Sequence, residues 1–107
     1  MSIFSIFHRQ DMNDGVEQAR KTPGAVLLDV RTAEEYAEGH VPGSRNIPLD
    51  RISAALLDKG APLFVYCRSG ARSSQACAIL QQRGYQATNI GGILSYDGTL
   101  EQGGEEE

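Results

Sequence analysis

Two short apolar runs constrain this chain more than any other feature. They are "AVLLDV", residues Ala25 to Val30, and "PLFVYC", residues Pro62 to Cys67. Both are partly β-branched or aromatic, and both are too short to be helices, so they predict central strands of a parallel sheet that is covered on both faces. Weaker strand candidates are "SIF" near Ile6, the segment around Ile47, and the segment that ends at Ile90.

Helical segments alternate with these strands. Asp11 can cap "MNDGVEQARK", and Asp50 can cap "RISAALLDK". Thr32 and Glu35 have the spacing of a capping box in front of "AEEYAE". A fourth amphipathic segment follows Cys67 and is stopped by Gly84. Strands that alternate with helices predict an α/β domain with a mainly parallel sheet and helices on both faces.

The length fits one small domain. A chain of 107 residues can bury a core without disulfides or a structural metal. The last residues, "TLEQGGEEE", end in two glycines and three glutamates and have little to bury. We therefore predict a folded domain over residues 1–102 and a disordered acidic tail over residues 103–107.

The charge argues against nucleic acids and membranes as partners. The formal net charge is -4, whereas both of these partners favour basic patches. The beginning of the chain lacks the apolar region of a signal peptide, and no apolar run approaches the ~20 residues of a transmembrane helix. We therefore expect a cytoplasmic protein.

The residues after the second apolar run are suited to binding an anion. Cys67 ends the run, and "RSGARS" leads from it toward the next helix, where loop amides and a helix N-terminus can meet a ligand. Gly70 permits a tight turn, and Arg68 and Arg72 add cationic donors for oxyanions. Because such surroundings lower the pKa of a thiol, they predict that Cys67 is a nucleophile that attacks an anion or carries an adduct such as a persulfide.

The two cysteines and two histidines have other interpretations. Cys67 could be a buried structural thiol, but the glycine and arginines that follow it favour a reactive site. Cys77 borders the apolar helix face without cationic neighbours, which favours packing over a resolving thiol. A zinc site would need both cysteines to meet His8 and His40 from across the chain, so we expect no metal.

The sequence at this point resembles the rhodanese (thiosulfate sulfurtransferase) family in its single-domain form. The resemblance runs from about residue 25 to residue 92. "LLDVRTAEEYAEGHVPGSRNIPL" is similar to the first family signature, "VYCRSGARS" to the active-site loop, and "IGGI" to the last landmark. The family usually has a tryptophan a few residues after that landmark, whereas here Tyr96 stands nearby and the chain has no tryptophan.

The resemblance implies a five-stranded parallel sheet flanked by helices, and a cycle of sulfur transfer. In that cycle, Cys67 takes a sulfane sulfur from a small anionic donor such as thiosulfate and becomes a persulfide. The sulfur then passes to cyanide, a thiol or a thioredoxin-like acceptor. The resemblance implies no metal or organic cofactor, and we expect a monomer or weak dimer. The substrate-binding amides would be those of Arg68, Ser69, Gly70, Ala71 and Arg72.

Three residues of the first signature have structural interpretations. Asp29 ends a buried strand, so its charge needs a partner, either Arg31 or an arginine of the active-site loop. We therefore predict that Asp29 and Arg31 organise the loop. His40 lies among turn residues, which favours a hydrogen-bonded loop residue over a catalytic base. His8, in a polar stretch, is interpreted as a surface residue.

Two other functions use similar residues. Cysteine phosphatases and arsenate reductases place an arginine after five intervening residues, whereas four separate Cys67 from Arg72, and Ser73 occupies the sixth position. The shorter loop makes a tighter cradle, better sized to one sulfur than to a phosphoryl group. A non-catalytic docking or regulatory module of the same fold commonly lacks the loop cysteine, which is present here. The sequence therefore favours a sulfurtransferase.

Overall fold

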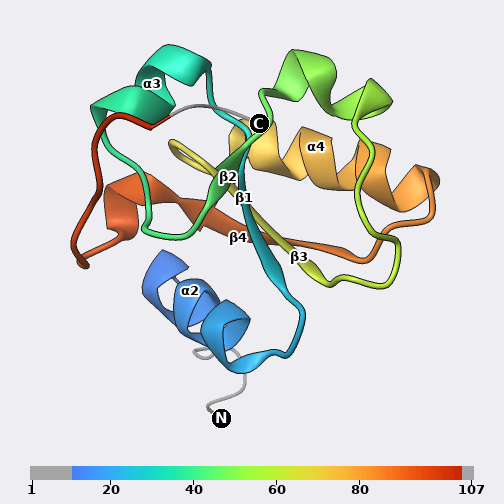
Figure 1. Cartoon of the computed structure of the whole chain (residues 1–107), viewed down its shortest axis with the longest axis horizontal. Coiled ribbons are helices and arrows are strands. Elements are labelled where there is room, and N and C mark those ends of the chain that lie inside the picture. The colour runs from blue at the N-terminus through green and yellow to red at the C-terminus, as the bar shows by residue number, and fades with distance from the viewer. Residues whose placement is uncertain (1–10, 105–107) are drawn as a thin grey trace, which may run out of the picture.

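A single parallel sheet forms the centre of the molecule (Figure 1). The structure, a computed structural model, describes residues 11–104. The sheet has the strand order β2-β1-β3-β4, and every neighbouring pair is parallel. The strands are β1 (Val26–Asp29), β2 (Arg45–Asn46), β3 (Leu63–Cys67) and β4 (Ala87–Gly92). The two apolar runs therefore form the adjacent central strands β1 and β3, as predicted.

The predicted strand number is wrong. The sheet described has four strands rather than five. The segments around Ile47 and before Ile90 supply β2 and β4, whereas the remaining candidate, near Ile6, lies outside the described residues, as does His8. Between residues 11 and 104, the other apolar segments belong to helices or turns, so nothing there supplies a fifth strand. Of the predicted tail, only Gly103 and Gly104 are described.

Helices cover both faces of the sheet, as predicted. Figure 1 shows α2 (Met12–Lys21) on one side, and α4 (Ala71–Gln82) with the 3-10 helix η1 (Leu49–Ala54) on the other. Each face has its own buried core. The α2 face includes Met12, Val16, Leu27, Phe64, Tyr66 and Ile90. The opposite face includes Leu28, Ile52, Leu63, Val65, Cys67, Ala76, Cys77 and Leu80.

Two of the predicted helix starts are confirmed and one is wrong. The Asp11 side chain accepts from the Asp14 N–H at the start of α2. Thr32 and Glu35 form both bonds of a capping box on the short helix α3 (Ala33–Glu38). Asp50, in contrast, does not cap η1 but lies inside it, because the helix begins at Leu49, directly after Pro48.

The topology brings the predicted nucleophile to an edge where loops meet. Cys67 is the last residue of β3, and three residues separate it from the first residue of α4. Because the strands are parallel, the segments after β1 and β2 reach the same edge of the sheet as this loop. No helix among residues 11–104 is long and apolar enough to span a membrane.

Candidate active site

The loop between β3 and α4 folds around the sulfur of Cys67. The main-chain N–H groups of Gly70 and Ser73 donate to Sγ at 3.0 and 3.3 Å. The Ser73 hydroxyl oxygen lies 3.4 Å from the same sulfur. Cys67 is 1% exposed, so these groups take the place of water around it. The loop is therefore built to stabilise negative charge on the thiol.

The hydrogen bonds determine the ionisation of Cys67. Burial by itself raises the pKa of the thiol, but the Ser73 hydroxyl and the N–H groups of Ser73, Gly70 and Ser69 outweigh it and lower the pKa below its ordinary value. Among residues 11–104, no such donor reaches Cys77, and burial raises its pKa to about 11. Cys77 packs in the core on the α4 face, which confirms the prediction that it is a packing residue.

Two glycines give the loop its shape. Gly70 has a φ of +106°, a left-handed conformation that places its N–H on the sulfur side of the turn. Gly92, at the end of β4, has an extended φ of -129° but lies directly beneath the loop. A Cβ on Gly92 would lie 2.1 Å from the Arg68 carbonyl oxygen and 2.5 Å from the Ser69 Cα. Only glycine lets β4 approach the loop so closely.

Two polar residues outside the predicted set anchor the loop. The Ser73 hydroxyl lies 2.7 Å from Asn89 Oδ1, and Asn89 Nδ2 donates to the Gly70 carbonyl at 3.2 Å. A β-bulge follows Asn89, since Val65 pairs with Asn89 whereas Tyr66 pairs with Gly91. The position of Ser73 six residues after Cys67 was visible in the sequence, but its contact with Asn89 was not.

The arginines of the loop differ in their surroundings. Arg72 forms a two-pronged ion pair with Glu35 of α3, with nitrogen–oxygen distances of 2.7 and 3.0 Å. The hydrogen bond from Arg72 is the main reason that the pKa of Glu35 is lowered to about 2. Glu35 thus caps α3 and also ties it to the loop. Arg68 is exposed and forms no ion pair within residues 11–104.

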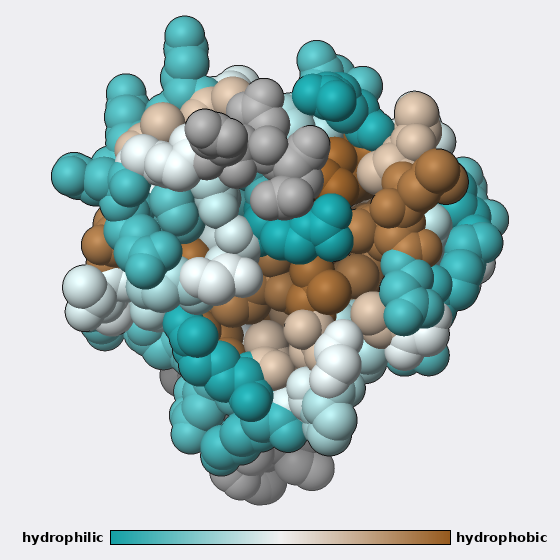
Figure 2. Space-filling view, in the orientation of Figure 1, coloured by the Kyte–Doolittle hydropathy of each residue, from teal (hydrophilic) through white to brown (hydrophobic). Residues whose placement is uncertain are grey.

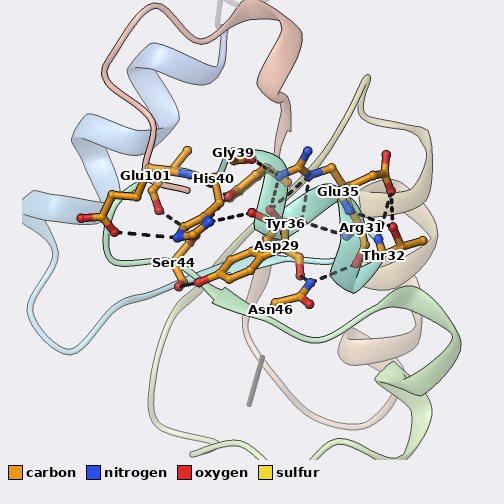
Figure 3. A network of polar contacts seen from close by, with 12 residues as sticks. Asp29, Arg31, Thr32, Glu35, Tyr36, Gly39, His40, Ser44, Asn46 and Glu101 are labelled. Atoms are coloured by element: carbon orange, nitrogen blue, oxygen red, sulfur yellow. Dashed lines mark hydrogen bonds and ion pairs between the residues drawn. The ribbon is translucent and has the colours of Figure 1, made fainter. Parts of the chain in front are cut away.

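The end of β1 is held by a buried ion pair (Figure 3). The Asp29 carboxylate accepts from Arg31 at its main-chain N–H, Nε and Nη2, at 2.9, 3.1 and 2.8 Å. Arg31 Nη2 also donates to the Gly39 carbonyl. Asn46 Nδ2 donates to the carbonyls of Asp29 and Arg31. Of the two partners that the sequence left open for Asp29, the structure has Arg31, and the pair holds the segment between β1 and β2.

His40 is a hydrogen-bonded loop residue, as predicted. Its Nδ1 lies 2.7 Å from the Tyr36 carbonyl, and its ring stacks on that of Tyr36 with centroids 3.7 Å apart. Its Nε2 lies 3.8 Å from a Glu101 carboxylate oxygen, as Figure 3 shows. His40 and Glu101 also exchange two main-chain hydrogen bonds. These contacts join the segment at Glu101 to α3 and give both ring nitrogens of His40 partners outside the Cys67 loop.

Two hollows adjoin η1. One, of about 570 Å³, has a mainly apolar surface and reaches the loop at Arg72. Its apolar walls are Val30, Ala33, Pro48 and Leu49. The other, of about 510 Å³, lies between β2 and η1. Figure 2 shows apolar surface in a depression near the centre of the face turned to the viewer, bordered by hydrophilic side chains. Within residues 11–104, no group of three or more His, Cys, Asp and Glu side chains could hold a metal ion.

Comparisons with known proteins identify the family. The family model for the rhodanese-like domain matches residues 12–102. The chain belongs to the rhodanese-like domain family. The rhodanese chain is 40% identical over 79 residues to a sulfurtransferase of Allochromatium vinosum, a match that covers 70% of this chain and 74% of the relative. It is 44% identical over 71 residues to the thiosulfate sulfurtransferase PspE of Escherichia coli, covering 62% and 68%.

A solved structure extends the likeness to three dimensions. A rhodanese from E. coli, determined with anions, superposes with a TM-score of 0.65 at 38% identity, and the match covers 74% of this chain and 99% of that one. The relatives support sulfur transfer of the rhodanese type as the general activity of this chain.

Proposed function

We propose that this rhodanese-family protein is a sulfurtransferase that carries a sulfane sulfur as a persulfide on Cys67, with thiosulfate as a donor. The Cys67 thiolate attacks the outer sulfur of the donor, and a new S–S bond forms. The S–S bond of thiosulfate breaks, and its electron pair leaves on sulfite. Cyanide or a thiolate then attacks the outer sulfur of the persulfide, which restores the Cys67 thiolate. No oxidant is needed in either step.

The observation that carries the proposal is the ring of donors around the Cys67 sulfur. Gly70 and Ser73 donate to Sγ, and the pKa of the thiol is lowered despite its burial. The N–H groups of Ala71 and Arg72 belong to the first turn of α4 and have no partner within that helix. In the proposal they bind the anionic end of the donor, together with Arg68 and Ser69. The relative PspE is named a thiosulfate sulfurtransferase, which supports thiosulfate as that donor.

The hollow beside Arg72 supports a thiol as the physiological acceptor. Its volume is about 570 Å³ and its surface is mainly apolar, whereas cyanide is a small ion that would fill little of this space. A low-molecular-weight thiol or the reactive end of a thioredoxin-like protein would fill more of it. In this proposal Asp29 and Arg31 act indirectly, by fixing the segment that forms one wall at Val30 and Thr32.

The ion pair of Arg72 favours sulfur transfer over phosphate chemistry. Two of the five N–H donors of its guanidinium bind Glu35, so its positive charge is already paired with a carboxylate before a phosphoryl group could bind. A purely docking role would leave the low-pKa thiol without a use. Robust hydrolysis of p-nitrophenyl phosphate without sulfur uptake would overturn this assignment.

The direct test is sulfur uptake from thiosulfate followed at each cysteine. Tryptic cleavage after Lys59, Arg68 and Arg72 places Cys67 in peptide 60–68 and Cys77 in peptide 73–83. We expect a gain of ~32 Da, one sulfur on the thiol, in the first peptide only. Cys67→Ser should abolish uptake and the production of thiocyanate from cyanide. Cys77→Ala, the matched control, should retain both.

Sulfur on peptide 73–83, or turnover that survives in Cys67→Ser, would refute the assignment of Cys67. A wild-type protein that takes up no sulfur from thiosulfate or from a panel of other sulfane donors would support the docking alternative. Comparing cyanide, a small thiol and a reduced thioredoxin as acceptors of the preloaded persulfide would then identify the acceptor class.

A further inference from the structure

The Ser73 hydroxyl stands between the reactive sulfur and a competing acceptor. Its oxygen lies 3.4 Å from Cys67 Sγ and 2.7 Å from Asn89 Oδ1. The carbonyl oxygens of Gly70 and Gly91 are farther than Asn89, at 3.1 and 3.5 Å. A hydroxyl has a single proton to donate, so Ser73 cannot serve the sulfur and the amide oxygen fully at once.

The orientation of the Asn89 amide is determined by main-chain groups. Its Nδ2 donates to the Gly70 carbonyl at 3.2 Å, and its Oδ1 accepts from the Gly91 N–H at 2.9 Å. A flipped amide would oppose like groups at both contacts. Oδ1 therefore faces Ser73 as an acceptor, and the short distance means that Ser73 donates to it when the sulfur carries no charge.

We propose that the Ser73 hydroxyl is a positioning group that follows the charge of Cys67, donating to Asn89 beside the neutral thiol and to the sulfur beside the thiolate. In the first state the thiol S–H points to the Ser73 oxygen. When the thiol proton is lost to the buffer, Ser73 keeps its own proton and rotates it toward Sγ. Asn89 Oδ1 then retains the Gly91 N–H. Asn89 thus restrains formation of the thiolate, whereas Ser73 promotes it.

This inference deepens the proposed function, because it explains how the same cysteine can be a nucleophile in one step and a leaving group in the next. Ser73 stabilises the thiolate that attacks the donor and that is regenerated when the acceptor takes the sulfur. In the persulfide the inner sulfur is uncharged, so the hydroxyl returns to Asn89. The N–H groups of Gly70 and Ser73, in contrast, are main-chain donors already directed at Sγ, and the proposal requires no movement of them.

The charges around the loop are the same in the wild type and in the variants of Ser73 and Asn89 that test the proposal. The charged groups nearest the sulfur are Arg68 and Arg72 of the loop and Glu35 of α3. Farther out lie Asp29 and Arg31 at the end of β1, and Asp50 and Arg51 of η1 beside Arg72. On the α2 side, Asp11 borders a hollow that Asn89 also lines. Substitutions of Ser73 and Asn89 by uncharged residues alter none of these, so a change in Cys67 ionisation reports on the hydrogen bonds.

The test measures the pH dependence of Cys67 alkylation by iodoacetamide, read from peptide 60–68. A hydrogen bond to an ionised group changes the thiolate population about tenfold. We expect Ser73→Ala to shift the alkylation profile to higher pH, so that alkylation slows about tenfold on the rising part of the wild-type profile and keeps its rate at high pH. Asn89→Leu removes the competing acceptor and should speed alkylation severalfold on the same part of the profile.

The double variant decides whether Asn89 acts through Ser73. In the Ser73→Ala background, Asn89→Leu should have no further effect. The neighbouring, exposed Ser74→Ala is the matched control and should follow the wild-type profile. An unchanged profile for Ser73→Ala would overturn the proposal. Slower alkylation of Asn89→Leu, or an equal effect in both backgrounds, would mean that Asn89 only holds the loop.

Asn89 is exposed, so Asn89→Leu should fold even if the variant of the buried Ser73 does not. The faster alkylation expected of Asn89→Leu then tests the proposal by itself. Alkylation requires no sulfur donor, so failure of the proposed function is seen separately. A wild-type protein that takes up no sulfur overturns that function and leaves these alkylation profiles intact.

Discussion

The buried ion pair between Asp29 and Arg31 should make a large contribution to the free energy of unfolding, which substitution of either residue can measure. Asp29 is 0% exposed and Arg31 is 5% exposed. Removing one partner leaves the other charge buried without compensation, which costs ~3–5 kcal/mol. We expect Asp29→Asn and Arg31→Met each to lower the free energy of unfolding by about 3 kcal/mol. This is a large part of the ~5–15 kcal/mol typical of a domain.

The double variant carries the sharper prediction. With both charges absent, no unpaired ion remains, and replacing a buried pair by uncharged residues is often close to neutral. The cost in Asp29→Asn/Arg31→Met should therefore be at least about 2 kcal/mol smaller than the sum of the single costs. Urea unfolding followed by circular dichroism, with equal denaturant slopes, gives all three values.

An exposed pair serves as the control. Lys21 and Glu17 of α2 form an ion pair at 3.1 Å, with side chains 73% and 64% exposed. Lys21→Met should change the free energy of unfolding by no more than about 0.5 kcal/mol, because surface pairs are weak. Single costs below about 1 kcal/mol at Asp29 and Arg31, or costs that simply add in the double variant, would refute the reasoning.

Two further predictions concern the loop and its partner helix. In Gly92→Ala the new Cβ must displace the Arg68 carbonyl, so we expect the free energy of unfolding to fall by about 1–3 kcal/mol and most sulfur uptake to be lost. In Gly91→Ala the Cβ enters open space but the residue has a φ of +101°, so we expect a loss of stability with sulfur uptake retained. The Glu35 carboxylate, whose pKa is lowered from 4.5 to about 2, stabilises the fold above the higher value and loses this effect as pH falls toward the lower one. Unfolding measured from pH 7 to pH 2 should therefore show a steeper acid loss in the wild type than in Glu35→Gln, and parallel curves would contradict this role.

Features of the fold that depend on neighbouring residues were predictable from the sequence. The apolar runs identify β1 and β3, and the spacing of Thr32 and Glu35 identifies the cap of α3. The segment from Cys67 to Arg72 likewise carries its chemistry in consecutive residues. The start of η1 was predicted wrongly, because the helix begins at Leu49, directly after Pro48, and Asp50 therefore lies inside it.

Contacts that decide the chemistry of the loop join distant parts of the chain. Ser73 and Asn89 are separated by 16 positions, and Arg72 and Glu35 by 37. A parallel α/β domain of the rhodanese type, with a cysteine in an amide-rich loop, was predictable from the sequence because hydrophobic periodicity, helix caps and glycines act locally. The ion pair of Arg72 with Glu35 depends on the tertiary structure, as does the 2.7 Å contact of Ser73 with Asn89 on which the proposed competition for the Ser73 proton rests. Hydrogen bonds of this kind exist only after β4 and α3 have packed beside the loop.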